Sequence, residues 1–411
     1  MPKESPSPDL IVLGGGVIGL SIAWRARERG MSVTVLERGV TGRGTSHVAA
    51  GMLAPVAEVE FGEAGRRILE LGLRSAEIWP AFADDLEAAA GMELGLMRRG
   101  TLLVARDEDE ARELERQIAF RDSLGLRAER LRPSEARTLE PALAPTLRLA
   151  MRAPDDSSVD PRLVLAALRR ACESAGVRVR EHARVARIES DSAGGGPQAR
   201  VTGVTIDGDA SKDGIEFVAG GRLVVAGGTW VEQIGGLPAE ARVPVRPVKG
   251  QIVRLRDPAG PGLLRGSVRF GHGYLVPRAD GRYILGGTME ERGFDTQPTA
   301  GAIHEVLREA HELVPAVSEL EIEELSVGLR PGTPDNAPVI GPGALEGLMW
   351  ATGHYRNGIL LAPLTAELVV AALAGDGLAN PLLATCSPAR FAGTFASSQQ
   401  ECAPSSEVAV S

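Results

Sequence analysis

Residues 10–37 read LIVLGGGVIGLSIAWRARERGMSVTVLE, and this stretch decides the fold. Its pattern predicts a buried strand, a glycine turn, a helix over 17–29 and a second strand. Gly14, Gly16 and Gly19 have the spacing of a dinucleotide-binding turn. In such a turn the first glycine allows the sharp bend, the second lets a pyrophosphate approach the backbone, and the third lets the helix pack against the strand.

Two further features of the stretch belong to the same signature. The N–H groups at the start of the helix, at Val17 and Ile18, would face the phosphates. Glu37 ends the second strand, where its carboxylate can accept both ribose hydroxyl protons. The order of these elements predicts a dinucleotide site rather than an ordinary βαβ turn, but it does not separate NAD from FAD.

Composition narrows the class of protein. A chain of 411 residues is long enough for two domains, and an apolar content of 44% with 50 glycines suits an α/β enzyme. A net charge of -9 argues against a nucleic-acid-binding surface, which would be basic. The cysteines, Cys172, Cys386 and Cys402, are scattered and form no CxxC pair. We therefore expect a reducing, cytoplasmic compartment and no structural metal.

The two ends of the chain carry no targeting signal that we recognise. Residues 1–10 have no apolar region of the kind found in signal peptides, and the first strand is interrupted by glycines. No stretch has the length of a bilayer span, so we expect no membrane contact. Residues 387–411 are small, polar and aperiodic, which predicts a disordered tail.

Patterns in the rest of the chain predict the remaining elements. They are helices over 64–90, 107–124, 161–174 and 302–313, a strand over 102–104, a strand pair around Val185, a hairpin at 199–207, a strand in the segment 222–234 with Gly227 and Gly228 at its C-terminal end, alternating strands from 244 to 289, a strand ending at Arg330 and a helix starting near Gly358. From Pro244 onward, the sequence pattern changes from that of a parallel α/β unit to that of short antiparallel strands in an α+β domain.

Two glycine-rich segments are candidates for further cofactor contacts. Residues 38–55 read RGVTGRGTSHVAAGMLAP, and Arg43 with Thr45 and Ser46 could close over a pyrophosphate. A flexible surface loop is the alternative interpretation. Gly227 and Gly228 follow a strand, so this turn either approaches the same cofactor or is a purely structural connection.

Six motifs together go beyond a generic fold. GGGVIG with Glu37, TSHVAAGMLAP, VKGQIVRL, HGYLVPR, GLRPGTPDNAPVIG and GHYRNGILLAP resemble the glycine oxidase branch of the D-amino acid oxidase family, the thiamine-pathway enzymes called ThiO. The resemblance runs from about residue 9 to 375. It implies non-covalent FAD, oxidation of glycine, sarcosine or small D-amino acids to the imine, transfer of electrons to dioxygen, and a homotetramer. The imine could be handed to a thiazole synthase.

The resemblance also implies roles for single residues. Arg330 matches the arginine that binds the substrate carboxylate, and a guanidinium fork suits that group better than a lysine would. Tyr274 matches a tyrosine whose hydroxyl bonds the same carboxylate, and His272 lies near that position. Met52 and Met289 match apolar residues near the flavin ring and the substrate. Each of these residues, taken alone, could instead be an ordinary surface or core residue.

The turn GHYRNG before the last helix suggests an electrostatic role. A helix that begins near Gly358 would direct its N–H groups toward the negative charge of reduced flavin, and Arg356 would add charge there or at the substrate. The turn contains no thiol, so covalent attachment of flavin is not expected. We expect cofactor contacts at Gly14, Gly16, Val17, Ile18, Gly19, Glu37, Arg38, Thr45, Ser46, Ala50, Gly51, Met52, Val185, Gly227, His354, Tyr355, Arg356, Asn357, Gly358, Ile359 and Leu360.

These inferences combine into one expected architecture. A Rossmann-like FAD-binding domain, of class α/β, is interleaved with an α+β substrate domain built on an antiparallel sheet. The first domain comprises residues 8–85, 155–240 and 325–378, and the second comprises 86–154 and 241–324.

The expected reaction needs no conventional acid/base pair, because hydride would pass directly from the substrate to the flavin, and no such constellation stands out in the sequence. Two alternatives remain open. One is a dehydrogenase of the same fold with another substrate or electron acceptor. The other is a non-catalytic module that binds FAD or NAD structurally.

Overall fold

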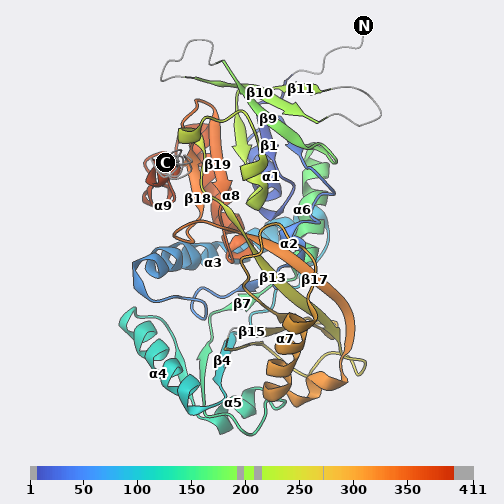
Figure 1. The fold of residues 1–411 in the computed structure, drawn as a ribbon, viewed down its shortest axis with the longest axis vertical. Coiled ribbons are helices and arrows are strands. Elements are labelled where there is room, and N and C mark those ends of the chain that lie inside the picture. Colours follow the sequence, from blue (N-terminus) through green and yellow to red (C-terminus); the bar gives the residue numbers. More distant parts are fainter. Residues whose placement is uncertain (1–6, 192–198, 208–214, 272, 393–411) are drawn as a thin grey trace, which may run out of the picture.

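A six-stranded sheet forms one half of the molecule (Figure 1). The computed structural model describes residues 7–191, 199–207, 215–271 and 273–392. The strand order is β18 (Val339–Pro342), β19 (Leu348–Thr352), β12 (Leu223–Val225), β1 (Leu10–Leu13), β2 (Val33–Leu36) and β8 (Arg178–Arg180). All neighbouring strands are parallel except β18, which runs antiparallel to β19.

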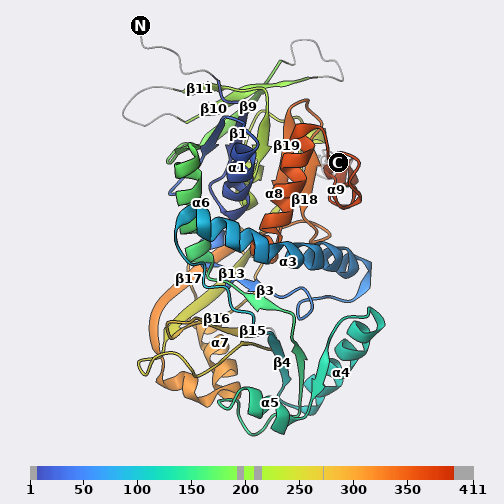
Figure 2. The same cartoon turned by 180° about the vertical axis from the view of Figure 1, so that it is seen from behind.

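The two faces of this sheet are covered differently. One face packs against α1 (Val17–Glu28), α3 (Gly62–Ala90), α6 (Pro161–Ala175) and α8 (Gly358–Ala374), as Figure 2 shows. The other face packs against the small antiparallel sheet β9 (Val185–Ser190), β10 (Val201–Ile206) and β11 (Glu216–Ala219). Side chains alternate along a strand, so Leu10 and Val12 face the helices while Ile11 and Leu13 face the small sheet.

The second half of the molecule is an eight-stranded sheet. Its order is β17 (Glu321–Gly332), β13 (Arg246–Arg256), β16 (Arg282–Gly286), β15 (Gly273–Pro277), β14 (Ser267–Phe270), β4 (Thr101–Ala105), β6 (Leu149–Ala153) and β5 (Glu129–Leu131). Only the β14–β4 pair is parallel among these described strands. The helices α4 (Glu108–Ser123), α5 (Pro133–Leu139) and α7 (Ala300–Leu313) pack beside it.

Short elements join the two halves. They are α2 (Thr45–Val48), β3 (Met52–Leu53), which pairs with β7 (Ser157–Ser158), and the turns η1 (Gly228–Gln233) and η2 (Ala239–Ala241). The turn η3 (Pro315–Glu319) follows α7 and packs in the core of the eight-stranded sheet. One face of the eight-stranded sheet presents Ile252, Val276 and Ile284 to Ala50 of the loop after α2. The long strand β17 therefore runs directly past the segment that follows the first βαβ unit.

The expected fold class is confirmed, with two local corrections, to the strand pair around Val185 and to the start of the tail. The strand β12 ends at Val225, directly before the segment of Gly227 and Gly228 expected at its C-terminal end, and the chain continues as η1. The strands around Val185 do not pair with each other: β8 joins β2, and β9 joins β10. The predicted tail begins too early, since α9 (Pro381–Thr385) is followed by η4 (Pro388–Phe391) with Phe391 buried. Residues 393–411 lie outside the described chain.

Among the described residues, no helix combines the length and the apolar character needed to cross a bilayer.

Candidate functional site

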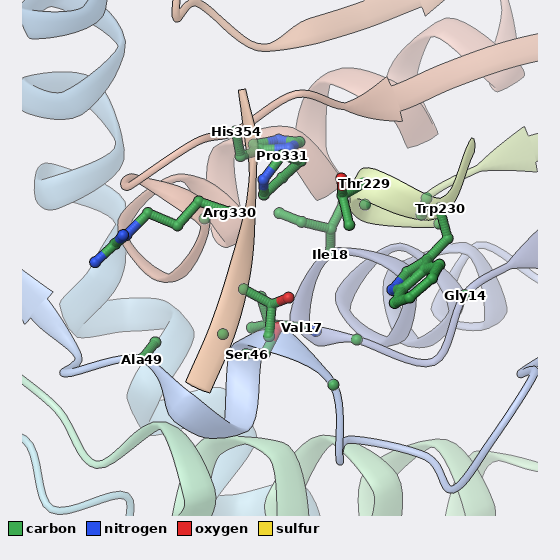
Figure 3. Close-up of a pocket in the computed structure, with 18 of the residues that line it drawn as sticks. Gly14, Val17, Ile18, Ser46, Ala49, Thr229, Trp230, Arg330, Pro331 and His354 are labelled. Atoms are coloured by element: carbon green, nitrogen blue, oxygen red, sulfur yellow. Dashed lines mark hydrogen bonds between the residues drawn. The ribbon is translucent and has the colours of Figure 1, made fainter. Parts of the chain in front are cut away.

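A cavity of about 460 Å³ lies between the six-stranded and the eight-stranded sheet (Figure 3). Leu13, Leu36 and Ala226, which end or directly follow β1, β2 and β12, line it. Ligands of open parallel sheets bind beyond the carboxyl ends of their strands. The cavity therefore occupies the position where the glycine turn predicts a dinucleotide.

The glycine turn forms one end of this cavity. Gly14 has a φ of 107°, and a Cβ added there would lie 2.5 Å from the Ala226 carbonyl oxygen. The backbone N–H of Val17 donates to Ser46 Oγ at 3.2 Å, which brings the loop of α2 to the start of α1. This end of the cavity thus presents backbone donors and a hydroxyl, which suit phosphate oxygens.

Glu37 stands at the end of β2 and lines the cavity. Its Oε2 accepts from the N–H of Gly15 at 2.7 Å, and its Oε1 accepts from the N–H of Gly39 at 2.8 Å. These two bonds fix the carboxylate beside the glycine turn. A carboxylate at this position suits the hydroxyls of a ribose.

The second glycine turn lines the same cavity, so its position favours a cofactor contact over a purely structural connection. Gly227, Gly228 and Thr229 all lie on the cavity wall. Trp230, which the sequence analysis did not single out, lies on this wall as well. The guanidinium carbon of Arg38 is 3.5 Å from the centre of its ring.

Arg330 lies across the cavity from Gly14 (Figure 3), and Tyr274 also lines the cavity. The two residues come from β17 and β15 of the eight-stranded sheet and lie near each other, since a Cβ on Gly287 would be 3.3 Å from the Tyr274 hydroxyl and 3.5 Å from Arg330 Nη2. Glycines on neighbouring strands give both side chains room. A Cβ on Gly250 would lie 2.2 Å from Arg330 Nη1, and a Cβ on Gly286, which pairs with Tyr274, would lie 2.5 Å from the Tyr274 hydroxyl. The motif VKGQ thus has a steric reason for its glycine.

The guanidinium of Arg330 and the hydroxyl of Tyr274 can both donate hydrogen bonds to a ligand. Arg330 Nη1 donates to the carbonyl oxygens of Thr288 at 2.9 Å and Lys249 at 3.4 Å, which commits one arm of the guanidinium and leaves its other donors for a ligand. Burial raises the pKa of Tyr274, an effect that the nearby charge of Arg330 opposes. The phenol therefore stays protonated at neutral pH and can donate to a carboxylate.

The turn before α8 brings three predicted residues to the cavity. Burial lowers the pKa of His354 to about 3, so its imidazole is neutral, and Nε2 lies 2.9 Å from Thr365 Oγ1. Tyr355 has a φ of 47°. Arg356 Nη2 donates to Glu60 Oε1 at 2.9 Å, so its charge is partly balanced from the loop before α3. The charge at this turn is thus carried by Arg356 and not by His354.

The start of α8 also reaches the cavity, as the turn GHYRNG predicts. Gly358 and Ile359 line it. Asn357, the N-cap residue of α8, makes no side-chain capping hydrogen bond among the residues that the structure describes. First-turn N–H groups without an intrahelical partner favour negative charge. Leu360 does not line the cavity, and its carbonyl oxygen accepts from Ser75 and Trp79 in the helical core.

The structure brings most of the predicted residues together. The cavity is lined by Gly14, Gly16, Val17, Ile18, Glu37, Arg38, Thr45, Ser46, Ala50, Gly51, Met52, Val185, Gly227, Tyr274, Arg330, His354, Tyr355, Arg356, Gly358 and Ile359. Gly19, Asn357, Leu360 and Met289 are predicted residues that do not line it. Met289 is 48% exposed, and its sulfur accepts from the Tyr355 hydroxyl at 3.4 Å. His272 lies outside the described residues.

Several lining residues were missed by the sequence analysis, among them Gly15, Glu58, Arg184, Thr229, Trp230 and Thr352. Glu58 is the most consequential, because it places a carboxylate at the end of the cavity that holds Arg330. Its Oε1 is 3.4 Å from Arg269 Nη1. No motif spacing marks this residue, and only the fold brings its loop to the cavity.

The donors of the cavity fit FAD. Amides and Ser46 suit the pyrophosphate, and Glu37 suits the ribose. The small residues Ala49, Ala50 and Gly51 also line the cavity and leave room for a planar ring. A Cβ on Gly16 would meet only Ser46 Oγ, at 3.4 Å, so this side of the turn is open to a ligand.

Comparisons with known proteins agree with this assignment. The profile of the family described as "FAD dependent oxidoreductase" (DAO) matches residues 9–372. A glycine oxidase of Geobacillus kaustophilus is 36% identical over 364 residues, which cover 88% of this chain and 91% of that protein. A bifunctional ThiO/ThiG protein of Synechocystis sp. is 37% identical, over 97% of this chain and 56% of that protein.

A solved structure leads to the same family. The crystal structure of glycine oxidase from Geobacillus kaustophilus superposes with a TM-score of 0.83 at 34% identity, covering 93% of this chain and 98% of that one. With the cavity and its donors, these similarities establish that this chain belongs to the DAO family of FAD-dependent oxidoreductases.

Proposed function

We propose that this protein oxidises glycine, sarcosine or a small D-amino acid to the imine, with FAD as cofactor and dioxygen as electron acceptor. The observation that carries the proposal is that Arg330 lies across the cavity from Gly14 (Figure 3), with Tyr274 near it on the cavity wall. A guanidinium and a phenol hydroxyl together suit a carboxylate. The similarity to a glycine oxidase of Geobacillus kaustophilus supports an amino acid as substrate.

The residues of this chain would act mainly by orientation. Arg330 takes the substrate carboxylate with the donors that Thr288 and Lys249 leave free, and Tyr274 donates a further hydrogen bond. The amine binds as the free base. Bound FAD supplies the hydride acceptor, so the chain needs to hold the substrate at a fixed place rather than to transfer its proton. The first-turn N–H groups of α8 favour negative charge on the cofactor.

Anaerobic reduction of the flavin tests the proposal. The purified holoenzyme is mixed with glycine, sarcosine or D-alanine without oxygen, and bleaching of the flavin band at about 450 nm is followed. We expect bleaching with at least one of the three. A flavin that stays oxidised with all of them refutes the assigned reaction.

The variant Arg330→Lys tests the carboxylate site. A lysine cannot reproduce the fork, so we expect the substrate concentration for half-maximal reduction to rise by ~100-fold, equivalent to about 3 kcal/mol. The flavin spectrum should be unchanged. Arg256→Lys is the matched control, because Arg256 lies on the neighbouring strand and pairs with Glu323 outside the cavity. Equal behaviour of both variants would contradict the role of Arg330.

The electron acceptor is tested separately. An oxidase forms one hydrogen peroxide for each substrate molecule oxidised, whereas a dehydrogenase leaves dioxygen untouched. We expect stoichiometric peroxide. Its absence in air, with flavin that is still reduced by substrate, would move the assignment to a dehydrogenase of the same fold.

Three further parts complete the proposal. The similarity to a bifunctional ThiO/ThiG protein, of which this chain covers 56%, supports delivery of the imine to a thiazole synthase. We also propose a homotetramer, which light scattering of the purified protein would test. The domain limits at 8–85, 155–240 and 325–378, against 86–154 and 241–324, also remain part of the proposal. The strands of the two large sheets follow these limits except β17, whose residues 325–332 fall in the first domain but pair within the eight-stranded sheet.

A further inference from the structure

Two buried arginines outside the cavity hold the backbone of the loop that lines it. Arg254 lies on β13 and is 3% exposed, and Arg278 directly follows β15 and is 4% exposed. Arg254 Nη2 donates to the carbonyl oxygens of His47 at 2.8 Å and Val48 at 3.3 Å. Arg278 Nη2 donates to the carbonyl oxygen of Ala50. Neither arginine lines the cavity itself.

The loop that they hold runs the length of the cavity. Its start is at the phosphate end, where Ser46 contacts the N–H of Val17. Its end is near the proposed substrate site, because Ala50 belongs to the apolar cluster in which Met52 and Tyr274 also pack. Figure 3 shows Ser46 close to Val17 and Ala49 farther along toward the side of Arg330. The peptide between Ala50 and Gly51 is therefore beside the part of the cavity that would receive the flavin ring.

The bond from Arg278 fixes the direction of this peptide. A trans peptide is planar, so its carbonyl and its N–H point to opposite sides. The Ala50 carbonyl points away from the cavity to a guanidinium, and Gly51 lines the cavity. The N–H of Gly51 is consequently directed toward the cavity.

The donor of this hydrogen bond, the guanidinium of Arg278, is positively charged. Burial lowers the pKa of Arg278 to about 10, which leaves the side chain protonated at neutral pH. Its nearest carboxylate oxygen, Asp160 Oδ2, is 3.8 Å from Nε and is shared with Arg282 at 3.0 Å. A cation that donates to a carbonyl polarises the peptide and strengthens the N–H on its other side as a donor.

We infer that Arg278 is a positioning residue for FAD, which aims and polarises the Gly51 N–H toward the flavin ring and so favours the reduced, more negative cofactor. Arg254 has the companion role of holding α2. The inference rests on the proposed placement of the flavin ring between the glycine turn and Arg330. It assigns an electrostatic task to a side chain that does not touch the cavity.

The test compares four variants of the holoenzyme in two measurements, the dissociation constant of FAD and the midpoint potential of the bound flavin. Arg278→Met removes the bond and the charge, Arg278→Gln keeps a donor without the charge, and Arg278→Lys keeps the charge. Arg282→Met is the matched control, because Arg282 shares Asp160 but is bonded to carboxylates and not to the loop.

We expect Arg278→Met to bind FAD roughly tenfold more weakly, the equivalent of one charge-assisted hydrogen bond, and to have a more negative midpoint potential. Arg278→Gln should share the shift in potential, Arg278→Lys should largely restore it, and Arg282→Met should match the wild type. A folded Arg278→Met variant with unchanged potential and affinity overturns the inference. Should that variant not fold, equal potentials in Arg278→Gln, Arg278→Lys and the wild type overturn it.

These readouts are independent of the substrate. Reduction of the wild type by amino acids judges the proposed function, whereas the potentials are measured without any amino acid. Failure of one therefore does not imply failure of the other.

Discussion

The glycines of the first turn have different neighbours, and so their replacement has different consequences. A Cβ on Gly19 would lie 1.9 Å from the Gly14 carbonyl oxygen, a backbone atom that cannot move without shifting α1. A Cβ on Gly16 would meet only Ser46 Oγ at 3.4 Å and would project into the cavity. Gly19 is therefore needed for the packing of the fold, and Gly16 is needed for the space that a ligand would occupy.

This contrast predicts opposite phenotypes. Gly19→Ala should lower the free energy of unfolding of the apoprotein by about 3 kcal/mol, as overpacking against backbone does. Gly16→Ala should leave that stability nearly unchanged and weaken FAD binding by at least roughly tenfold, since the methyl group occupies ligand space. Urea unfolding of the apoprotein and fluorescence titration with FAD measure the two quantities. Equal stability losses in both variants would contradict the assignment.

Single residues were predictable where a motif fixes their place. Glu37 follows the glycine turn at a set distance, and Arg330 lies in the motif GLRPGTP; both line the cavity. Trp230 and Glu58 were missed, because each is brought to the cavity by a loop whose path depends on contacts with distant segments. The reason for glycine at positions 250 and 286 becomes clear only from the strand pairing, which places the side chains of Arg330 and Tyr274 beside them.

At the scale of elements, the segment after α9 is an ordered part of the fold. Phe391 is 8% exposed and packs in the core behind β19, with Leu348 and Trp350. Arg390 Nε donates to Asp335 Oδ2 at 2.9 Å, and its Nη2 donates to the Ala337 carbonyl at 2.9 Å. The segment thereby fastens the loop that follows β17.

Phe391→Ala should therefore lower the free energy of unfolding by about 3 kcal/mol, the usual cost of deleting a buried ring. Leu378→Ala is the control, because Leu378 is 59% exposed and its truncation should change stability by less than about 0.5 kcal/mol. Urea unfolding measures both. If Phe391→Ala is as stable as the control, the segment does not contribute to the core.

Elements with a strong local pattern were predictable, and those set by pairing were not. The helix α1 is bounded by its turn and by Gly30, and α8 starts at Gly358 as expected. Short strands are different, since the segments 178–180 and 185–190 look alike in sequence but join separate sheets. Their partner strands lie far away in the chain, so the local sequence pattern does not identify them.

At the scale of the whole molecule, the cavity depends on loops that are fixed from both halves. The loop after β3, which carries Glu58, is held by hydrogen bonds to both its N–H groups and its carbonyl oxygens. Asp156 accepts from the N–H groups of Val56 at 3.2 Å and Ala57 at 3.0 Å, and Arg121 donates to the carbonyl oxygens of the same two residues at 2.9 Å each. Asp156 is only 1% exposed. A buried carboxylate thus belongs to the support of the cavity wall.

This carboxylate predicts a pH dependence of global stability. Burial raises the pKa of Asp156 to about 7 from 3.8 in the unfolded chain, so the folded protein binds its proton more tightly. The resulting stabilisation is complete below the unfolded pKa and is lost as the pH rises through about 7. Over this range the wild type should lose, relative to Asp156→Asn, on the order of a few kcal/mol in the free energy of unfolding.

Urea unfolding of the wild type and Asp156→Asn at a series of pH values between about 4 and about 8 measures this difference directly, because all other titrating groups are common to both proteins. Asn keeps a carbonyl oxygen for one of the two N–H groups and cannot ionise, so its stability relative to the wild type should rise with pH. Asp155→Asn is the control: Asp155 is exposed, and its contact with Arg127 is 3.5 Å long. Its stability curve should run parallel to that of the wild type. If the curve of Asp156→Asn also runs parallel, the buried carboxylate does not change its protonation between these pH values, and the loop of Glu58 is held by a permanent charge.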